Sequence, residues 1–208
     1  MRITALEPES RSGGVRVELD ERPFGTIGAN DVADLGLGEG RAISDDVSAE
    51  LMRRAEAFSA RTVAMRMLAA RSLSSAEVHR RLLRKGHSRP ACDSAVQGLV
   101  SAGLINDREF ARHFARIRTR RRIGPRRVMA DLRRMGVPER DATAAINEAL
   151  ESEGVDPQAA LREAAEHRAR SLKGLDTDTA RRRLRAYLLR RGFGGSEVLS
   201  VVKDAVPR

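Results

Sequence analysis

One pattern of nine residues occurs three times in this chain, and each copy ends in glycine, at Gly86, Gly136 and Gly192. Aligning the glycines also aligns pairs of apolar residues four positions apart, which lie on one face of a helix. A glycine directly after such a helix suits the left-handed residue that ends many helices. The pattern therefore predicts three copies of one helical unit. The aligned apolar residues are Val78, Val128 and Leu184, then Leu82, Leu132 and Leu188.

Each copy is flanked by two further helical patterns. A first helix is expected over 60–70, 107–121 and 157–172. Repeats of about fifty residues favour a string of small helical bundles. We therefore expect a mainly α fold, in which three tandem three-helix repeats form an elongated array. In the third helices, which follow the glycines, the aligned residues are Val96, Ile146 and Val202, then Val100, Leu150 and Val206.

The segment before the repeats has strand patterns instead. Val15, Val17 and Leu19 alternate with charged residues, which is the period of a half-buried strand, and a strand is expected on either side of this one. Ser44, followed by two aspartates, is a suitable N-cap, and Ser59 is expected to separate that helix from the first repeat. These patterns predict a small β-rich module over 1–58, with repeats over 59–104, 105–152 and 153–208.

Positive charge is concentrated in the repeats. The formal net charge is +10, but residues 1–58 hold 7 Lys and Arg against 12 Asp and Glu, so that 59–208 carry a net charge of +15. Such an excess favours polyanionic partners, namely nucleic acid, an anionic membrane surface or an acidic protein groove. Nearly all these cations are arginines, which suit bidentate contact with phosphate or carboxylate. A genome rich in G and C would enrich arginine equally well.

The candidate binding residues are cations on the first and second helices of the repeats. Residues 108–134 alone hold eleven arginines against Glu109 and Asp131. A run of charges is often only a solvated helix face, but this excess recurs on the same helix of all three units, without acids four residues away to balance it. We therefore predict a distributed polyanion-binding surface. Its candidate residues are Arg80, Arg81, Arg84, Lys85, Arg112, Arg116, Arg118, Arg120, Arg121, Arg122, Arg126, Arg127, Arg133, Arg134, Arg181, Arg182, Arg185, Arg190 and Arg191.

Sequence-specific reading of DNA is not favoured. A helix that ends in glycine before another helix resembles a helix-turn-helix, whose second helix reads base edges. The helices after the three glycines carry few of the Arg, Asn and Gln side chains that do so. With five Phe, one Tyr and no Trp, the chain has few rings for stacking on single strands. Contact with phosphates, without sequence readout, remains.

Residues that would support catalysis or metal binding are scattered. The four histidines lie far apart and Cys92 has no second cysteine, so a zinc site lacks its ligands and a reducing cytoplasm is expected. Motifs for a phosphate-binding loop, a dinucleotide or a nucleophile elbow do not occur, nor does a stretch of about 18 apolar residues. We expect no catalytic residues, metal, cofactor, small-molecule substrate or membrane span.

Several stretches resemble motifs of the RecX family. The first is 72–86, and the second is 99–112, followed by 124–127 and 132–136. Together they cover much of 60–150, and a weaker third copy follows. The N-terminal module also resembles a short β-rich extension that some family members carry. The chain departs from the family pattern at His113 and Phe114, where an aromatic Tyr or Trp is common.

The resemblance implies a regulator of recombination and DNA repair, without enzymatic activity. Members of this family lodge in the groove of the RecA–DNA filament, where they limit its extension, ATPase activity and strand exchange. Under this interpretation the arginine rows would face acidic protein surface and DNA phosphate. Phe110 and Phe114, four residues apart, are expected to pack in the core and not to form a contact surface.

Two other functions fit parts of the sequence. The arginine excess alone would suit a sequence-tolerant DNA-binding protein that acts without RecA. The acidic N-terminal module would suit a protein–protein adaptor with no role in nucleic-acid binding.

Overall fold

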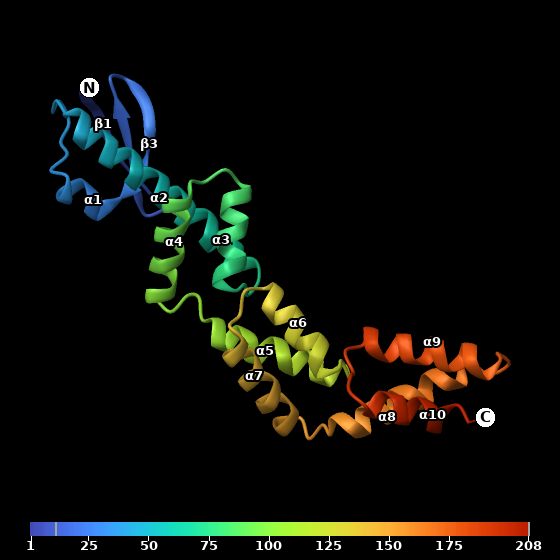
Figure 1. Ribbon diagram of the computed structural model, residues 1–208. Coiled ribbons are helices and arrows are strands. Elements are labelled where there is room, and N and C mark those ends of the chain that lie inside the picture. Colours follow the sequence, from blue (N-terminus) through green and yellow to red (C-terminus); the bar gives the residue numbers. More distant parts are fainter. Residues whose placement is uncertain (11, 208) are drawn as a thin grey trace. The chain divides into compact units, whose positions relative to one another are not determined.

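The computed structural model describes residues 1–10 and 12–207, and Arg208, with which the predicted third repeat ends, lies outside them. The chain divides into two compact units, Met1–Asn106 and Asp107–Arg208. Over the described residues, the first unit holds a three-stranded sheet and four helices, and the second holds six helices (Figure 1). The predicted fold class is confirmed, because three three-helix repeats follow a small β-rich module.

The β-rich module is an antiparallel sheet with the strand order β1-β2-β3. Val17 and Leu19 of the central strand lie in a buried cluster with Ile3 and Ile27, as their alternation with charged residues predicts. A short helix, α1, follows the sheet, and the Asp31 carboxylate near its start accepts a hydrogen bond from the Gly28 N–H at 2.8 Å. The elements are β1 (Ile3–Glu9), β2 (Gly14–Leu19), β3 (Arg22–Gly28) and α1 (Ala29–Asp34).

A single long helix, α2 (Asp45–Ala70), joins the module to the first repeat. Its N-cap is Ser44, whose hydroxyl accepts a hydrogen bond from the Val47 N–H, as predicted. The predicted interruption at Ser59 is wrong: neither glycine nor proline occurs along the helix, and a serine inside a helix does not end it. Leu51 of α2 packs in the module core, whereas Ala60 and Ala64 pack in the core of repeat 1. The predicted boundary between residues 58 and 59 therefore falls inside one continuous helix.

Each repeat has its own buried core. The second half of α2 completes repeat 1, in agreement with the sequence pattern over 60–70. None of the described helices has the length and hydropathy needed to cross a bilayer. The helices are α3 (Ser75–Arg84) and α4 (Arg89–Ser101) in repeat 1; α5 (Asp107–Arg120), α6 (Pro125–Arg134) and α7 (Glu139–Ser152) in repeat 2; and α8 (Pro157–Arg170), α9 (Thr177–Arg190) and α10 (Glu197–Ala205) in repeat 3.

The three glycines end their helices in the same way. Gly86, Gly136 and Gly192 have φ of 90°, 84° and 89°, in the left-handed region that favours glycine. In each case the glycine N–H donates to the carbonyl three residues back, and the next N–H donates to the carbonyl five residues back. That second acceptor belongs to the aligned leucine, which is fully buried in all three repeats. The aligned third helices match less well, since Val100 is 47% exposed and Leu99 is buried in its stead.

Candidate functional site

Arg81, one of the candidate cations of α3, is paired within its own helix. Arg81 forms an ion pair with Glu77, one turn before it, and Arg71 contacts the same carboxylate at 2.9 Å. The expectation that acids four residues away are missing is therefore wrong at this place. Arg84 and Lys85 are exposed at the carboxyl end of α3, where positive charge is stabilised by the helix dipole. Arg80 is also exposed.

In repeat 2, one stripe of arginines on α5 faces acids of α7 and of the residue that follows it. Arg112 pairs with Glu148 at 3.0 Å, and Arg120 pairs with Glu153 at 2.7 Å. The hydrogen bond from Arg120 lowers the pKa of Glu153. Arg116, on the same stripe, lies near enough to add to that shift. These acids lie more than thirty residues away, so local charge spacing could not reveal that much of the stripe is neutralised.

Between α5 and α6, by contrast, the arginines outnumber the acid that they contact. Asp131 is only 3% exposed, and its carboxylate contacts three arginines. The distances are 3.0 Å to Arg134 Nη2, 3.3 Å to Arg127 Nε and 3.7 Å to Arg118 Nη2. Here one negative charge faces three positive charges. We call Asp131 with these three arginines the Asp131 cluster.

An aromatic pair supports this cluster from α5. The rings of Phe110 and Phe114 stack with centroids 6.2 Å apart and pack against the core of repeat 2, which confirms their predicted packing role. The Arg118 guanidinium carbon lies 4.9 Å from the centroid of the Phe114 ring, a cation–π contact. Phe114 therefore helps to fix the position of Arg118 beside Asp131.

A mainly apolar groove lies on the other side of α6, against α7. It encloses about 430 Å³ and is lined by Met129, Ala130 and Ile146, with Arg126 and Arg133 at its polar positions. Arg133 also forms an ion pair with Glu139. The arginines of α6 thus divide into two sets, of which one surrounds a buried carboxylate and the other borders an apolar groove.

Repeats 2 and 3 meet at a junction built from backbone and one arginine. The N–H of Gly124, the N-cap of α6, donates to the Arg191 carbonyl at 2.8 Å, and the Arg126 N–H donates to the Gly192 carbonyl at 3.1 Å. In return, Arg191 Nη2 donates to the carbonyls of Arg121 and Arg122 at 2.9 Å each. The end of α9, which lies beside the start of α6 in Figure 1, therefore caps that start. The Arg191 side chain caps the end of α5.

The predicted binding residues Arg191, Arg122 and Arg121 all take part in this junction. Arg191 Nη1 also donates to the Tyr187 hydroxyl at 3.1 Å, so that both its terminal nitrogens are engaged inside the protein. Arg122 contacts Glu163 of repeat 3 at 3.7 Å and has a left-handed φ of 54°. The exposed Arg121 contributes its carbonyl to the same junction.

The remaining candidates lie on α9. Arg181 donates from Nε to the Val206 carbonyl at 2.9 Å and thereby caps the end of α10. Arg182 donates to the Thr179 hydroxyl one turn earlier, at 3.3 Å. Arg185 and Arg190 are exposed along the helix. In this repeat, as in repeat 1, we find helix-stabilising contacts at part of the predicted set.

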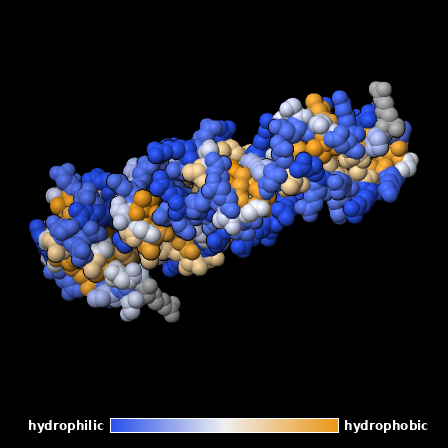
Figure 2. All heavy atoms as spheres, turned by 90° about the horizontal axis from the view of Figure 1, so that it is seen from below, coloured by the Kyte–Doolittle hydropathy of each residue, from blue (hydrophilic) through white to orange (hydrophobic). Residues whose placement is uncertain are grey.

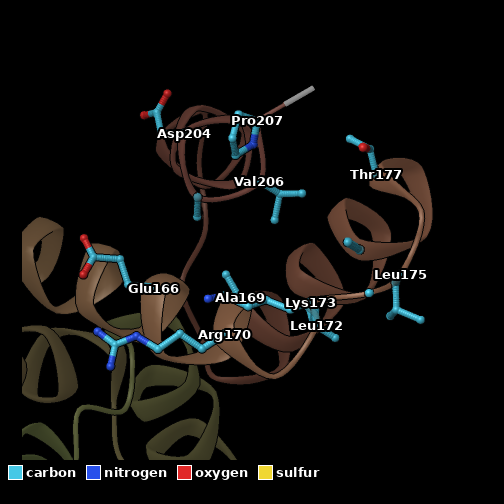
Figure 3. A pocket seen from close by; sticks show the side chains of 13 residues that line it. Glu166, Ala169, Arg170, Leu172, Lys173, Leu175, Thr177, Asp204, Val206 and Pro207 are labelled. Carbon is cyan, nitrogen blue, oxygen red and sulfur yellow. The ribbon is translucent and has the colours of Figure 1, made fainter.

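Another cavity, in repeat 3, has mixed charge. It encloses about 580 Å³ between α8 and the segment around Val206. Figure 3 shows Glu166 and Arg170 on α8 at one side of it and Asp204 at the other. With Lys173 it is lined by two acids and two cations, so its formal charge gives no preference for a polyanion.

Within the described residues, no group of three or more His, Cys, Asp and Glu side chains is placed to hold a metal ion. Cys92 is buried in repeat 1, and this burial raises the pKa of its thiol. On the face drawn in Figure 2, hydrophilic side chains surround small, separate hydrophobic areas. The Asp131 cluster differs from the other candidate arginines, because it gathers three of them from two helices around one buried acid.

Comparison with known proteins identifies related sequences over all three repeats. The models of the first, second and third three-helix domains of RecX match residues 60–99, 106–146 and 155–202. The regulatory protein RecX of Pelodictyon phaeoclathratiforme is 32% identical over 145 residues, which are 69% of this chain and 87% of the relative. The one of Geobacillus kaustophilus is 28% identical over 97% of this chain and 75% of its own length.

Solved structures share the fold. A crystal structure of a regulatory protein RecX covers 98% of both chains with a TM-score of 0.75 at 18% sequence identity. RecX from Lactobacillus salivarius covers 72% of this chain and 96% of its own, with a TM-score of 0.58 at 17% identity.

Proposed function

The chain belongs to the RecX family, and from this premise we propose that it regulates a RecA recombinase in the cytoplasm by binding the RecA–DNA filament. It acts by binding and not by catalysis, with its helical repeats in the filament groove. There it limits filament extension, and so lowers ATPase activity and strand exchange.

The Asp131 cluster is the observation that best supports the nucleic-acid part of this proposal. In it three arginines contact one buried carboxylate, whereas Arg112 and Arg120 of the α5 stripe are each matched by an acid, Glu148 and Glu153. Arginine forks suit phosphate geometry. Contacts of this kind do not depend on base sequence, as a protein that follows a filament along any DNA requires.

The groove between α6 and α7 supports contact with protein. Its apolar floor would receive an apolar side chain of RecA, and Arg126 and Arg133 at its polar positions would favour acidic neighbours. Because the groove and the Asp131 cluster flank the same helix, α6, one repeat would contact protein and DNA together.

A binding experiment tests this proposal. RecA filaments are assembled on single-stranded DNA with a non-hydrolysable ATP analogue, and the affinity of the chain for them is compared with its affinity for the same DNA alone. We expect tighter binding to the filament. Equal affinities would mean that RecA contributes no contact.

The second candidate function, DNA binding without RecA, is favoured by the same cluster. It predicts equal affinities in that comparison and no effect on RecA at protein concentrations that leave most of the DNA free.

The adaptor hypothesis loses its simplest test, because deleting residues 1–58 would cut through α2, a helix that also packs in repeat 1.

A further inference from the structure

We propose that Asp131 is a positioning residue for nucleic-acid binding: its buried carboxylate gathers Arg118, Arg127 and Arg134 into one site for a backbone phosphate. This inference rests on the proposed function in one respect, that the chain meets nucleic acid. It assigns that contact to one set of residues and gives a carboxylate, not a cation, the organising role.

The geometry favours organisation over simple neutralisation. The side chains of Arg118, Arg127 and Arg134 are 33%, 51% and 70% exposed, whereas that of Asp131 is 4% exposed. The carboxylate therefore lies beneath the guanidinium groups, and they separate it from solvent. A buried carboxylate is costly unless it is paired, so Asp131 draws toward itself three side chains that would otherwise repel one another.

The contacts with Asp131 leave guanidinium groups able to bind a second anion. The closest contact of Arg127 with the carboxylate is through Nε, at 3.3 Å, and its side chain is 51% exposed. Arg118 is held in addition by the Phe114 ring. A guanidinium has five N–H donors, and a fixed one loses less conformational entropy on binding.

The neighbouring junction further restricts Arg127. A Cβ built on Gly192 would lie 2.2 Å from the Cβ of Arg127, so the end of α9 packs directly against this residue. Arg126, the residue before it, donates its N–H to the Gly192 carbonyl. The main chain that carries Arg127 is thus fixed by repeat 3 while its side chain is fixed by Asp131.

A phosphate fits this cluster better than a carboxylate from a protein partner. Arginines from two helices approach from different directions, which suits a tetrahedral anion whose oxygens accept hydrogen bonds on several sides. A peptide would also need apolar anchorage, and the apolar groove lies on the other side of α6.

The test uses the full chain and the variant Asp131→Asn, for which two mechanisms predict opposite changes in DNA affinity. The affinity for a fluorescent DNA duplex is measured by anisotropy over a series of salt concentrations, well below the melting temperature of each variant. Asp131→Asn adds one net positive charge, yet we expect it to weaken binding about tenfold and to reduce the slope of log K against log salt by about one. The control, Glu148→Gln, removes an exposed acid from α7 and is expected to tighten binding slightly.

A rise in affinity for Asp131→Asn, like that of the control, would show that Asp131 competes with phosphate, and would overturn the proposal. A second result would also overturn it: unchanged DNA affinity and slope, together with weaker inhibition of RecA ATPase, would assign the cluster to an acidic protein surface.

A second pair of variants keeps the test sharp if Asp131→Asn unfolds. Arg127→Gln and Arg162→Gln each remove one exposed arginine from the second unit, but only the first belongs to the cluster. We expect Arg127→Gln to lower DNA affinity about tenfold and Arg162→Gln about twofold. Equal losses would contradict the proposal. Because these measurements contain no RecA, they can fail or succeed independently of the effect on the recombinase.

Discussion

Arg191 of repeat 3 donates a hydrogen bond from Nη2 to the carbonyl oxygen of Arg122 in repeat 2, at a distance of 2.9 Å. Arg122 has a left-handed φ of 54°, a conformation that costs a residue other than glycine about 1 kcal/mol. The bond from Arg191 stabilises that conformation and satisfies a carbonyl at the end of α5. An arginine that the sequence alone assigns to a binding surface therefore also joins two repeats.

Replacing Arg191 with Ala tests this joining role. The variant leaves two carbonyls and the Tyr187 hydroxyl without their donor, so we expect the second unit to lose about 1–3 kcal/mol of stability. Thermal unfolding followed by circular dichroism measures the loss. Arg190→Ala, at the exposed neighbouring position, is the control, with an expected change within about 0.5 kcal/mol. A similar melting temperature for both variants would refute the joining role.

The junction also requires glycine at position 124. Its φ of −66° is open to any residue, but an added Cβ would lie 2.4 Å from the carbonyl of Gly192. We expect Gly124→Ala to destabilise the protein by about 1–3 kcal/mol through overpacking. The matched control is Gly98→Ala in α4, where an added Cβ meets nothing within 4 Å. That change should stabilise the helix by about 0.5–1 kcal/mol, and a loss of stability there would contradict this account of the two glycines.

The groove between α6 and α7 gives a prediction about protein contact. Ala130 is exposed at its lining, and Gln is a good helix former that would fill the groove without adding charge. We expect Ala130→Gln to raise the protein concentration needed for half-inhibition of RecA ATPase about tenfold, while DNA affinity stays within twofold. Ala159→Gln, at an exposed position of α8, should change neither. Equal effects of the two variants would remove the groove from the proposed interface.

Glu56 couples the stability of the first unit to pH. Its carboxylate accepts a hydrogen bond from the Ser88 N–H at 2.7 Å, which lowers the pKa of Glu56 below its ordinary value of 4.5. Because the folded pKa is lower than the unfolded one, the stabilisation is present above pH 4.5 and is lost as pH falls through the folded pKa. Glu56→Gln should therefore be less stable than the wild type at pH 7, with a difference that shrinks below pH 4.5. Denaturant unfolding at several pH values measures it, and a constant difference would contradict the assignment.

Local patterns predicted the repeat architecture well. Each aligned leucine lies about one helical turn before its glycine, and each glycine lies just after the helix. Short-range spacing therefore indicates where these helices end and which face of them is buried. The break expected at Ser59 was wrong because a serine that can cap a helix can also lie inside one. Packing against two different cores, through Leu51 and Ala60, keeps α2 continuous.

The candidate surface was harder to predict, because charge depends on partners that are distant in sequence. Arg120 is matched by Glu153, thirty-three residues away, and Arg191 contacts carbonyls about seventy residues away. The role proposed for Asp131 had one local signal, its position four residues after Arg127. The burial that makes this acid an organising group appears only when α5 packs on α6.

The central claim, regulation of RecA, is tested most directly by a titration of the DNA-dependent ATPase activity of the cognate RecA. The chain is added below the RecA concentration, and Asp131→Asn and Glu148→Gln are titrated beside the wild type. We expect wild type and Glu148→Gln to lower the ATPase rate at substoichiometric amounts, and Asp131→Asn to require more protein. An ATPase rate that the wild-type chain leaves unchanged would contradict the proposed function.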